Sequence, residues 1–447
     1  MKDLFAKYDV QIPRYTSYPT VPYWTGLPST EQWFGDIKRT LQNPAAAWSL
    51  YLHIPFCETL CTFCGCNNII TKNHSLEEQY ISLVHKEWDL YKAAAPDFLE
   101  RPLRLIHLGG GSPTFFQPES LRKLLKPILD NVKKEPGFEA SIEVDPRKTT
   151  AAQIQVLREL GFNRVSMGVQ DFEPEVQKLV NRIQPYSITA NLIEICREHG
   201  IPDVNFDLIY GLARQTPDSM RRTAKQTMEL RPSRIALYSF ALVPWIKPAQ
   251  RLFKDEDLPS GPAKRELYEI AREEFLSAGY VEIGMDHFAL PDDALALAAQ
   301  NKKLHRNFMG YTDQFSDLAL ALGISGISQT PYSYHQNEKL LAKYEESLHK
   351  NKIPSAKGHL MTAVDQERHR QILTLITQLK VTFTDAQQEA EAEKFLEEML
   401  KDRLVTLENH QLTITPKGKP FLRNVCAFFD EHMKANKPNL QIFSKSI

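Results

Sequence analysis

Short apolar segments alternate with amphipathic segments through the first 240 residues. Six apolar or alternating runs end at Gly, Pro or Asp, which is typical of buried parallel strands. Between them the apolar spacing is helical, with Thr150 and Thr216 as expected N-caps and Gly161 and Gly200 at expected helix ends. The predicted strands are 50–54, 104–108, 140–144, 164–169, 205–210 and 235–241, and the predicted helices are 76–93, 118–134, 151–160, 188–199 and 217–230.

Six consecutive strand–helix units predict an α/β fold built as a parallel barrel or partial (β/α)6 barrel. Beyond residue 286 strand signals become sparse, and from about residue 334 the pattern is mostly helical, with a small hairpin within 403–415. We therefore predict an N-terminal arm (1–35), a barrel with its extension (36–335) and a mainly helical C-terminal cap domain (336–447). The charge-rich stretch 387–401 is expected to be a solvated face.

The charge balance narrows the possible partners. The 447 residues include 54 Lys and Arg against 55 Asp and Glu, a formal charge of −1. Binding to nucleic acid normally requires a basic excess, so we expect no nucleic-acid partner. The chain shows no apolar run long enough for a membrane span and no signal-peptide pattern at its start, so we expect a cytoplasmic protein, acting as a monomer.

The cysteines are the strongest chemical signal in the chain. Two of the six, Cys196 and Cys426, are isolated and expected to be small buried apolar residues. The other four lie within ten residues and form one loop after the first predicted strand: Cys57, Cys61, Cys64 and Cys66. Without a secretory signal, such clustering favours thiolates that hold a metal over disulfides.

Tight spacing of three soft thiolates suits an iron–sulfur cluster. Three ligands would leave one iron free to bind and activate another molecule. A structural zinc site is the competing interpretation, although zinc usually draws its ligands from two separated knuckles. A patch of reactive thiols is a further alternative.

The spacing Cys57-X3-Cys61-X2-Cys64, with Phe63 before the third cysteine, resembles the signature of radical S-adenosylmethionine (SAM) enzymes. The longer run Tyr-X-His-Ile-Pro-Phe-Cys-X3-Cys-X2-Cys-Gly-Cys-Asn, which begins at Tyr51, is narrower. It resembles the oxygen-independent coproporphyrinogen III oxidase family of haem biosynthesis, and the resemblance covers nearly the whole chain. It implies that the predicted barrel is a radical SAM catalytic barrel.

In that family the three cysteines hold a [4Fe–4S] cluster whose fourth iron binds SAM. The resemblance implies a 5′-deoxyadenosyl radical that removes a propionate β-hydrogen, followed by oxidative decarboxylation of coproporphyrinogen III to protoporphyrinogen IX. An electron donor and an acceptor are also implied, and the sequence identifies neither. Cys66 matches a family cysteine that is not a cluster ligand, and it could instead protect or tune the site. No side-chain base is required, so no catalytic residue is assigned.

Loops after the predicted strands supply candidate cofactor residues. Three glycines at 109–111 follow the second strand and permit close approach of a ligand, although such a run can simply be a turn. Glu143 fits a ligand role, whereas Asp145 fits a helix cap better. The resemblance implies SAM contacts for Tyr51, Phe63, Gly110, Glu143 and Ile327, and a second SAM site lined by Gly111, Ser112, Gln170, Arg182, Asp207 and the backbone of Ala241.

An apolar tetrapyrrole with four carboxylates needs apolar walls and basic donors. Arg14 in the N-terminal arm and Arg306 and Phe308 in a later loop have this chemistry and resemble the family there. The alternatives are a surface arginine on an ordered arm and an ordinary ion pair. Met309 stands where close relatives have glutamine, which replaces a hydrogen-bonding group with an apolar wall. His287 is a further candidate, or a core histidine.

Two rival functions share much of this pattern. One is a haem chaperone with the same fold, cluster motif and SAM binding but no oxidase activity. The other is a radical SAM enzyme acting on another tetrapyrrole. Gly65, Cys66, Asn67 and the arm at 14–20 favour the oxidase.

Overall fold

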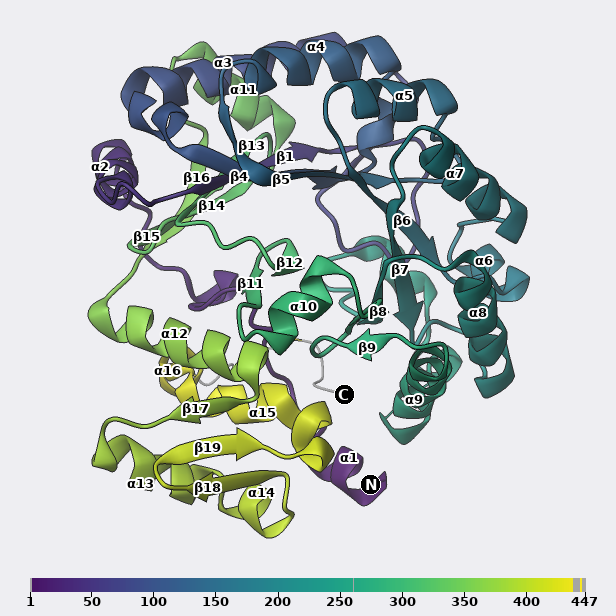
Figure 1. Ribbon diagram of the computed structural model, residues 1–447, viewed down its shortest axis with the longest axis vertical. Helices are drawn as coiled ribbons and strands as arrows, with labels where there is room; N and C mark the ends of the chain where they lie inside the picture. The colour runs from purple at the N-terminus through teal and green to yellow at the C-terminus, as the bar shows by residue number, and fades with distance from the viewer. Residues whose placement is uncertain (1, 260, 437–442, 444–447) are drawn as a thin grey trace.

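Six parallel strands form the centre of the molecule and match the six predicted from the sequence (Figure 1). The computed structural model describes residues 2–259, 261–436 and 443. The parallel strands are β1 (Trp48–Ile54), β4 (Pro102–Gly110), β5 (Lys133–Val144), β6 (Arg164–Gln170), β7 (Asp203–Tyr210) and β8 (Arg234–Ser239). The α/β prediction is therefore confirmed.

Helices cover the outer face of these strands (Figure 1). Thr150 and Thr216 cap their helices through capping boxes, and Gly161 and Gly200 have positive φ just beyond helix ends, as predicted. The predicted helix 118–134 is too long, because residues 133–134 pair with β4 as the start of β5. The covering helices are α3 (Leu76–Ala94), α4 (Pro118–Leu129), α5 (Ala151–Glu159), α6 (Pro174–Leu179), α7 (Tyr186–Glu198), α8 (Pro217–Leu230) and α9 (Gly261–Ser277).

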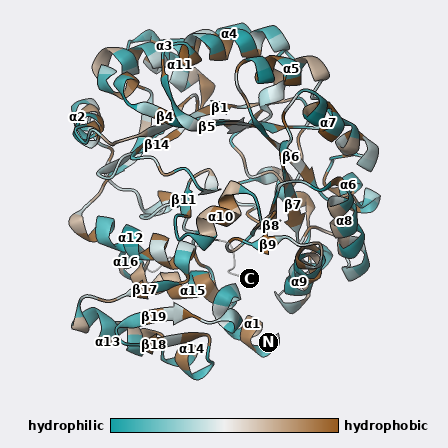
Figure 2. Cartoon of the chain, in the orientation of Figure 1, coloured by the Kyte–Doolittle hydropathy of each residue, from teal (hydrophilic) through white to brown (hydrophobic). Residues whose placement is uncertain are grey.

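The strands present apolar residues to these helices and polar residues to the inside of the curved sheet. In β7, Phe206 and Leu208 are buried in the main core, while Asn205 and Asp207 line an internal cavity. Figure 2 shows hydrophilic and hydrophobic residues side by side along the covering helices, as amphipathic packing requires. The inner face of the sheet is therefore where polar chemistry gathers.

The sheet continues well beyond residue 286, contrary to the prediction. It has twelve strands, and its edge strands β16 and β9 do not pair with each other within the described residues, so it is an open partial barrel. β13 runs parallel to β1, and the others added are antiparallel. The added strands are β9 (Val281–Glu282), β10 (His287–Ala289), β13 (Leu318–Leu322), β14 (Ile327–Gln329), β15 (Ser333–Asn337) and β16 (Ser355–Leu360).

These strands have two to six residues, too few for periodicity to identify them. The boundary predicted between residues 335 and 336 falls inside β15. The three-part domain division otherwise stays a prediction. Next to the sheet lie α2 (Thr30–Leu41), α10 (Ala294–Gln300), α11 (Leu341–His349) and the hairpin β11 (His305–Asn307) with β12 (Gly310–Thr312).

The C-terminal region packs beneath the open side of the sheet and is mainly helical, as predicted (Figure 1). Phe5, Ile12, Tyr15 and Tyr18 of the N-terminal segment belong to its core. The predicted hairpin is present as β18 and β19. The elements are α1 (Lys2–Tyr8) and then α12 (Ala363–Gln378), β17 (Lys380–Thr382), α13 (Ala386–Phe395), α14 (Glu397–Lys401), β18 (Val405–Glu408), β19 (Gln411–Ile414), α15 (Leu422–Cys426) and α16 (Glu431–Ala435).

The isolated cysteines and the hydropathy of the helices can also be compared with the sequence predictions. Cys196 and Cys426 are both fully buried, as predicted. Among the residues that the structure describes, every helix is too short or too polar to cross a lipid bilayer.

Candidate active site

The cysteine loop leaves the sheet directly after β1. Cys57 ends the short strand β2 (Phe56–Cys57), which pairs in parallel with β3 (Ile69–Ile70). The Thr71 amide donates to the Cys57 carbonyl at 2.9 Å, so the two ends of the loop are tied together. The chain between them is thereby held as a compact loop at the edge of the inner face.

Neighbouring segments fix the outer part of this loop. The Asn181 side chain donates to the Leu60 carbonyl at 2.8 Å, and the Gln250 side chain donates to the Phe63 carbonyl at 2.9 Å. The Phe63 ring packs against an apolar cluster formed by Val176, Val180, Leu212 and Phe240. The Phe63 ring therefore anchors the loop through apolar packing, and the Asn181 and Gln250 side chains hold the loop backbone through hydrogen bonds.

Two arginines approach the buried sulfur of Cys61. Arg182 Nη1 lies 3.6 Å from Cys61 Sγ, and Arg147 Nη2 lies 3.8 Å from it. Both guanidiniums also pair with Asp145, at 3.4 Å and 2.6 Å respectively. Asp145 thus orients the arginines and does not cap a helix; Thr150 caps α5 instead. Both guanidiniums thus point donors at the Cys61 sulfur, an arrangement that suits a metal-bound thiolate.

The sulfur of Cys64 also accepts hydrogen bonds. The Cys66 amide and the Asn68 side chain lie 3.4 Å and 3.5 Å from Cys64 Sγ. A hydrogen bond from the Cys66 thiol and the charge of Lys247 outweigh burial and lower the pKa of Cys64 to about 6, whereas burial raises the pKa of Cys57 to about 12. Cys66 therefore supports Cys64 through hydrogen bonds.

The sulfurs of Cys57, Cys61 and Cys64 do not converge as the ligands of a single ion would. Tetrahedral zinc with Zn–S bonds of about 2.3 Å holds its sulfurs about 3.8 Å from one another. Within the described residues, Cys57, Cys61 and Cys64 do not form a group whose donor atoms all lie within 4.8 Å. A multi-iron cluster does not need such convergence, because each thiolate binds a different iron.

The glycine-rich segment after β4 packs against the cysteine loop. The Gly110 amide donates to Glu143 Oε2 at 3.2 Å, and the Gly111 amide donates to the Ile54 carbonyl at 2.8 Å. Both amides donate hydrogen bonds to other parts of the protein. The glycines therefore allow close packing of the backbone here, besides any approach of a ligand. The Ser112 hydroxyl is buried and has no partner among the described residues.

Glu143 is held on the inner face by polar neighbours. His107 Nε2 donates to Glu143 Oε1 at 3.4 Å, and Ser141 Oγ donates to His107 Nδ1 at 2.7 Å. Burial favours a higher pKa for Glu143, but His107 and the Gly110 amide lower it below its usual value. Glu143 is therefore an ionised acceptor, and 42% of its side chain remains exposed in the cavity.

Tyr51 lies in β1, directly beside His107 of β4. Its ring stacks on His107 at 6.0 Å between centroids, and its hydroxyl donates to His53 Nδ1 at 3.1 Å. His53 Nε2 in turn donates to the Asn67 carbonyl at 2.9 Å. This chain of contacts links β1 and β4 to the end of the cysteine loop.

A cavity of about 340 Å³ lies over these residues. It brings together three residues predicted to contact SAM and one predicted to contact the substrate, which are Tyr51, Glu143, Ile327 and Phe308. Phe308 packs edge-on against Trp24 and Tyr334 at 6.2 Å and 5.9 Å. Met309 lines the same cavity, so it contributes an apolar wall there.

A second cavity of about 110 Å³ adjoins the first along His107, Glu143 and Met309. Asp207 lines it and accepts a hydrogen bond from Ser166 Oγ at 3.3 Å. Burial and the charge of Glu143 raise the pKa of Asp207 to about 7. Asp207 and Glu143 thus line one cavity, and their pKa values are shifted in opposite directions.

The other residues predicted for a second SAM lie at the ends of neighbouring strands. Gln170 ends β6 with φ of 68°, and Ala241 follows β8. Arg182 follows α6, and its Nη2 donates to the Gly168 carbonyl at 2.6 Å. Arg182 Nε is buried without a partner within the described residues.

The two arginines predicted to bind substrate are distant in the sequence but contact each other in the fold. Arg306 Nη1 donates to the Arg14 carbonyl at 3.4 Å, and Arg14 Nη2 donates to the Ser239 carbonyl at 2.6 Å. The Arg306 guanidinium lies 4.9 Å from the Tyr311 ring centroid, and its Nε has no partner among the described residues. Neither arginine forms an ion pair there, which leaves their charges available to an anion.

Asp286 and His287 form a pair close to these arginines. His287 Nδ1 donates to Asp286 Oδ1 at 2.7 Å. Burial favours a higher pKa for Asp286, but the charges of His287, Arg306 and Arg14 lower it to about 2. His287 also lines the smaller cavity, so it belongs to the site and not to the apolar core.

Sequence reasoning did not select His53, His107, Ser141 or Arg147. The sequence does contain a pattern that could have identified the strand residues among them: polar residues at every second position of otherwise apolar strands. His107 in β4 pairs in register with Tyr51 in β1 and with Ser141 in β5. Inward-facing positions of neighbouring strands therefore coincide, as the strand pleat requires.

The open parallel sheet, the triad of cysteines at its edge and the polar inner cavity together define a radical SAM enzyme. Residues 51–227 match the family model of the radical SAM superfamily. The chain is 38% identical to the oxygen-independent coproporphyrinogen III oxidase of Salmonella typhimurium, covering 99% of this chain and 98% of the relative.

It is also 37% identical to the enzyme of that name from Pseudomonas aeruginosa, covering 100% of this chain and 98% of the relative. The solved structure of coproporphyrinogen III oxidase from Escherichia coli, a radical SAM enzyme, matches with a TM-score of 0.88 at 38% identity, over 95% of this chain and all of that one. The chain belongs to the oxygen-independent coproporphyrinogen III oxidase family.

That family implies a [4Fe–4S] cluster and SAM, and the residues present fit both. Arginine, amide and thiol donors point at two sulfurs of the loop, as cluster-bound thiolates require. The partnerless Ser112 hydroxyl and the ionised Glu143 offer acceptors beside the loop for the hydroxyl and ammonium groups of SAM.

Proposed function

We propose that this chain converts coproporphyrinogen III to protoporphyrinogen IX by oxidative decarboxylation of two propionate side chains. The observation that carries the proposal is a cavity walled by Phe308, Tyr51 and Ile327, in which Tyr51 is linked through His53 to Asn67 at the end of the cysteine loop. Arg306 lies over the Tyr311 ring, which lines the adjoining smaller cavity, and Arg14 contacts the Arg306 guanidinium through its carbonyl; no described carboxylate pairs directly with either charge. A carboxylated apolar substrate matches that combination.

Cys57, Cys61 and Cys64 would hold the cluster, which together with SAM supplies a carbon radical able to remove a hydrogen atom. Tyr51, Phe63, Gly110, Glu143 and Ile327 would form the site for that SAM. Each decarboxylation removes one hydrogen atom, one further electron and CO₂ from a propionate, so an electron acceptor is needed as well as a donor. Glu143 would orient the SAM ammonium or ribose, and the apolar wall would exclude water.

A second SAM would suit two decarboxylations per substrate. Its site would be lined by Gly111, Ser112, Gln170, Arg182, Asp207 and the backbone of Ala241. The partnerless Ser112 hydroxyl and Arg182 Nε support this proposal, because buried polar groups without partners are costly. We propose that the protein acts as a monomer in the cytoplasm.

The test is an anaerobic assay of reconstituted protein with dithionite, SAM and coproporphyrinogen III. We expect protoporphyrinogen IX and 5′-deoxyadenosine to form together. Stable haem binding without turnover would instead identify a haem chaperone. Cleavage of SAM only with a different tetrapyrrole would identify another substrate.

A further inference from the structure

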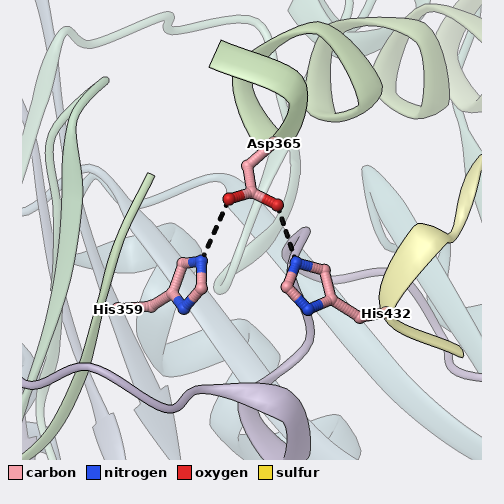
Figure 3. A group of neighbouring side chains, drawn as sticks. All are labelled: His359, Asp365 and His432. Carbon is pink, nitrogen blue, oxygen red and sulfur yellow. Dashed lines mark hydrogen bonds and ion pairs between the residues drawn. The ribbon is translucent and has the colours of Figure 1, made fainter. Parts of the chain in front are cut away.

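A second group of potential metal ligands lies in the C-terminal region, outside the cysteine loop (Figure 3). Asp365 Oδ2 lies 3.2 Å from His359 Nε2, and Asp365 Oδ1 lies 2.7 Å from His432 Nε2. The donor atoms of the three side chains all lie within 4.8 Å of one another. Both imidazoles present the same ring nitrogen to one carboxylate.

Three separate elements bring these side chains together. His359 lies in β16, Asp365 in the first turn of α12 and His432 in α16. His359 and Asp365 are buried, while 24% of the His432 side chain remains exposed, so an ion can reach the group from solvent. Packing therefore buries the side chains of His359 and Asp365, and the His432 side of the group faces solvent.

Hydrogen bonding has organised the carboxylate. The Thr362 amide and hydroxyl donate to Asp365 Oδ2 at 2.9 Å and 2.7 Å, which leaves Oδ1 facing His432. Despite burial, the hydrogen bonds from His359, His432 and Thr362 hold the pKa of Asp365 well below its usual value. Among the described residues no lysine or arginine pairs with Asp365.

We propose that His359, Asp365 and His432 bind one divalent transition-metal ion, with Zn²⁺ as the representative ion. Two imidazole nitrogens and one carboxylate oxygen are ligands that zinc and its neighbours accept. Calcium and magnesium prefer sites made only of oxygen, so they are disfavoured. Binding needs each Nε2 without its proton, and the exposed part of His432 keeps the group in contact with solvent.

The ion would join the C-terminal helix to the main sheet and to the N-terminal segment. The His432 ring contacts the rings of Tyr18 and Tyr23, with centroids 5.9 Å and 6.4 Å apart. The Glu431 amide donates to the Tyr18 hydroxyl at 3.1 Å. A metal at this point would therefore stabilise the contact between α16 and the N-terminal segment that holds Tyr18 and Tyr23.

The experiment measures zinc and iron per chain in the same samples of cluster-reconstituted protein after anaerobic dialysis against micromolar Zn²⁺. The cluster occupies the cysteine loop, and the iron content verifies this. Wild type is compared with Asp365→Asn, His432→Ala and the control His410→Ala. His410 also lies 2.7 Å from a carboxylate, that of Glu389, but it is exposed and is not part of a three-residue donor group.

We expect about one zinc ion per chain in wild type and in His410→Ala, and at least about tenfold weaker retention in the other two variants. Zinc should also raise the Tm of wild type and of His410→Ala, but not of His432→Ala. Since Asp365 also caps α12, His432→Ala decides the result if Asp365→Asn fails to fold. No zinc in wild type, or equal zinc in wild type and His432→Ala, would overturn the proposal and leave a hydrogen-bond network only. The readout is independent of enzyme activity.

Discussion

Arg182 Nη1 lies 3.6 Å from the sulfur of Cys61, although the two residues are 121 positions apart in the sequence. A positive donor at a cluster thiolate stabilises the more negative, reduced cluster. We therefore predict that Arg182→Met lowers the reduction potential of the reconstituted cluster. A lost hydrogen bond worth about 1 kcal/mol corresponds to roughly 40 mV for a one-electron couple. Potentiometric titration followed by EPR measures the reduction potential. The potential of Arg182→Lys should lie between those of wild type and Arg182→Met. An unchanged potential in Arg182→Met would contradict this prediction.

The three cysteines of the motif should be individually essential for the cluster. We predict that Cys57→Ser, Cys61→Ser or Cys64→Ser abolishes assembly, because each removes a thiolate ligand. Cys66→Ser should retain the cluster, since Cys66 acts on Cys64 only through hydrogen bonds. Iron and sulfide content after anaerobic reconstitution measures the outcome. Loss of iron in Cys66→Ser equal to that in the others would overturn the ligand assignment.

The contact between the glycine segment and the cysteine loop leaves no space for a side chain. A Cβ on Gly111 would lie 2.5 Å from the Pro55 carbonyl oxygen, a backbone atom that cannot move alone. We predict that Gly111→Ala destabilises the protein by about 1–3 kcal/mol and impairs cluster assembly. Gly65→Ala is the matched control, because a Cβ there meets nothing within 4 Å. Tm and iron content should fall only in Gly111→Ala, and equal losses would refute the steric explanation.

Arg306 should act on substrate binding more than on SAM. A charge-assisted hydrogen bond to a carboxylate is worth about 1.5–3 kcal/mol, so Arg306→Ala should raise KM for coproporphyrinogen III about tenfold or more. Cleavage of SAM without substrate should stay at the wild-type rate. Arg122→Ala, which removes a surface ion pair on α4, is the control. An unchanged KM in Arg306→Ala would remove this arginine from the substrate site.

A buried carboxyl group on α3, Glu87, should make stability depend on pH. Burial raises the pKa of Glu87 to about 7, despite hydrogen bonds from Gly323, Tyr344 and Asn337. Between pH 4.5 and 7 the folded protein keeps this proton while the unfolded chain releases it, so stability falls as pH rises through that window and levels off above it. The contribution is on the order of 3 kcal/mol.

Glu87→Gln removes this titration. Thermal unfolding at several pH values between 5 and 8 should give a shallower decline with pH for the variant than for wild type. Parallel curves for the two proteins would show that Glu87 keeps an ordinary pKa in the folded state.

Local patterns in the sequence determined the six parallel strands, the helices between them and the cluster cysteines. Periodicity and cap residues act over a few positions, so they can be read without knowing the fold. The motif around Cys57, Cys61 and Cys64 is equally local. The roles assigned through family resemblance to residues such as Gln170 and Asp207 remain predictions, although these residues do lie at or near the same end of neighbouring strands.

The tertiary structure alone decided the contacts between distant residues. Strands of two to six residues joined the sheet through pairing that no local pattern encodes. Arg182 meets Cys61, His107 meets Glu143, and His359 meets His432 only because packing brings separate elements together. The physical reason is that burial and hydrogen bonding in the folded state depend on three-dimensional neighbours, whereas hydrophobic periodicity depends only on neighbours along the chain.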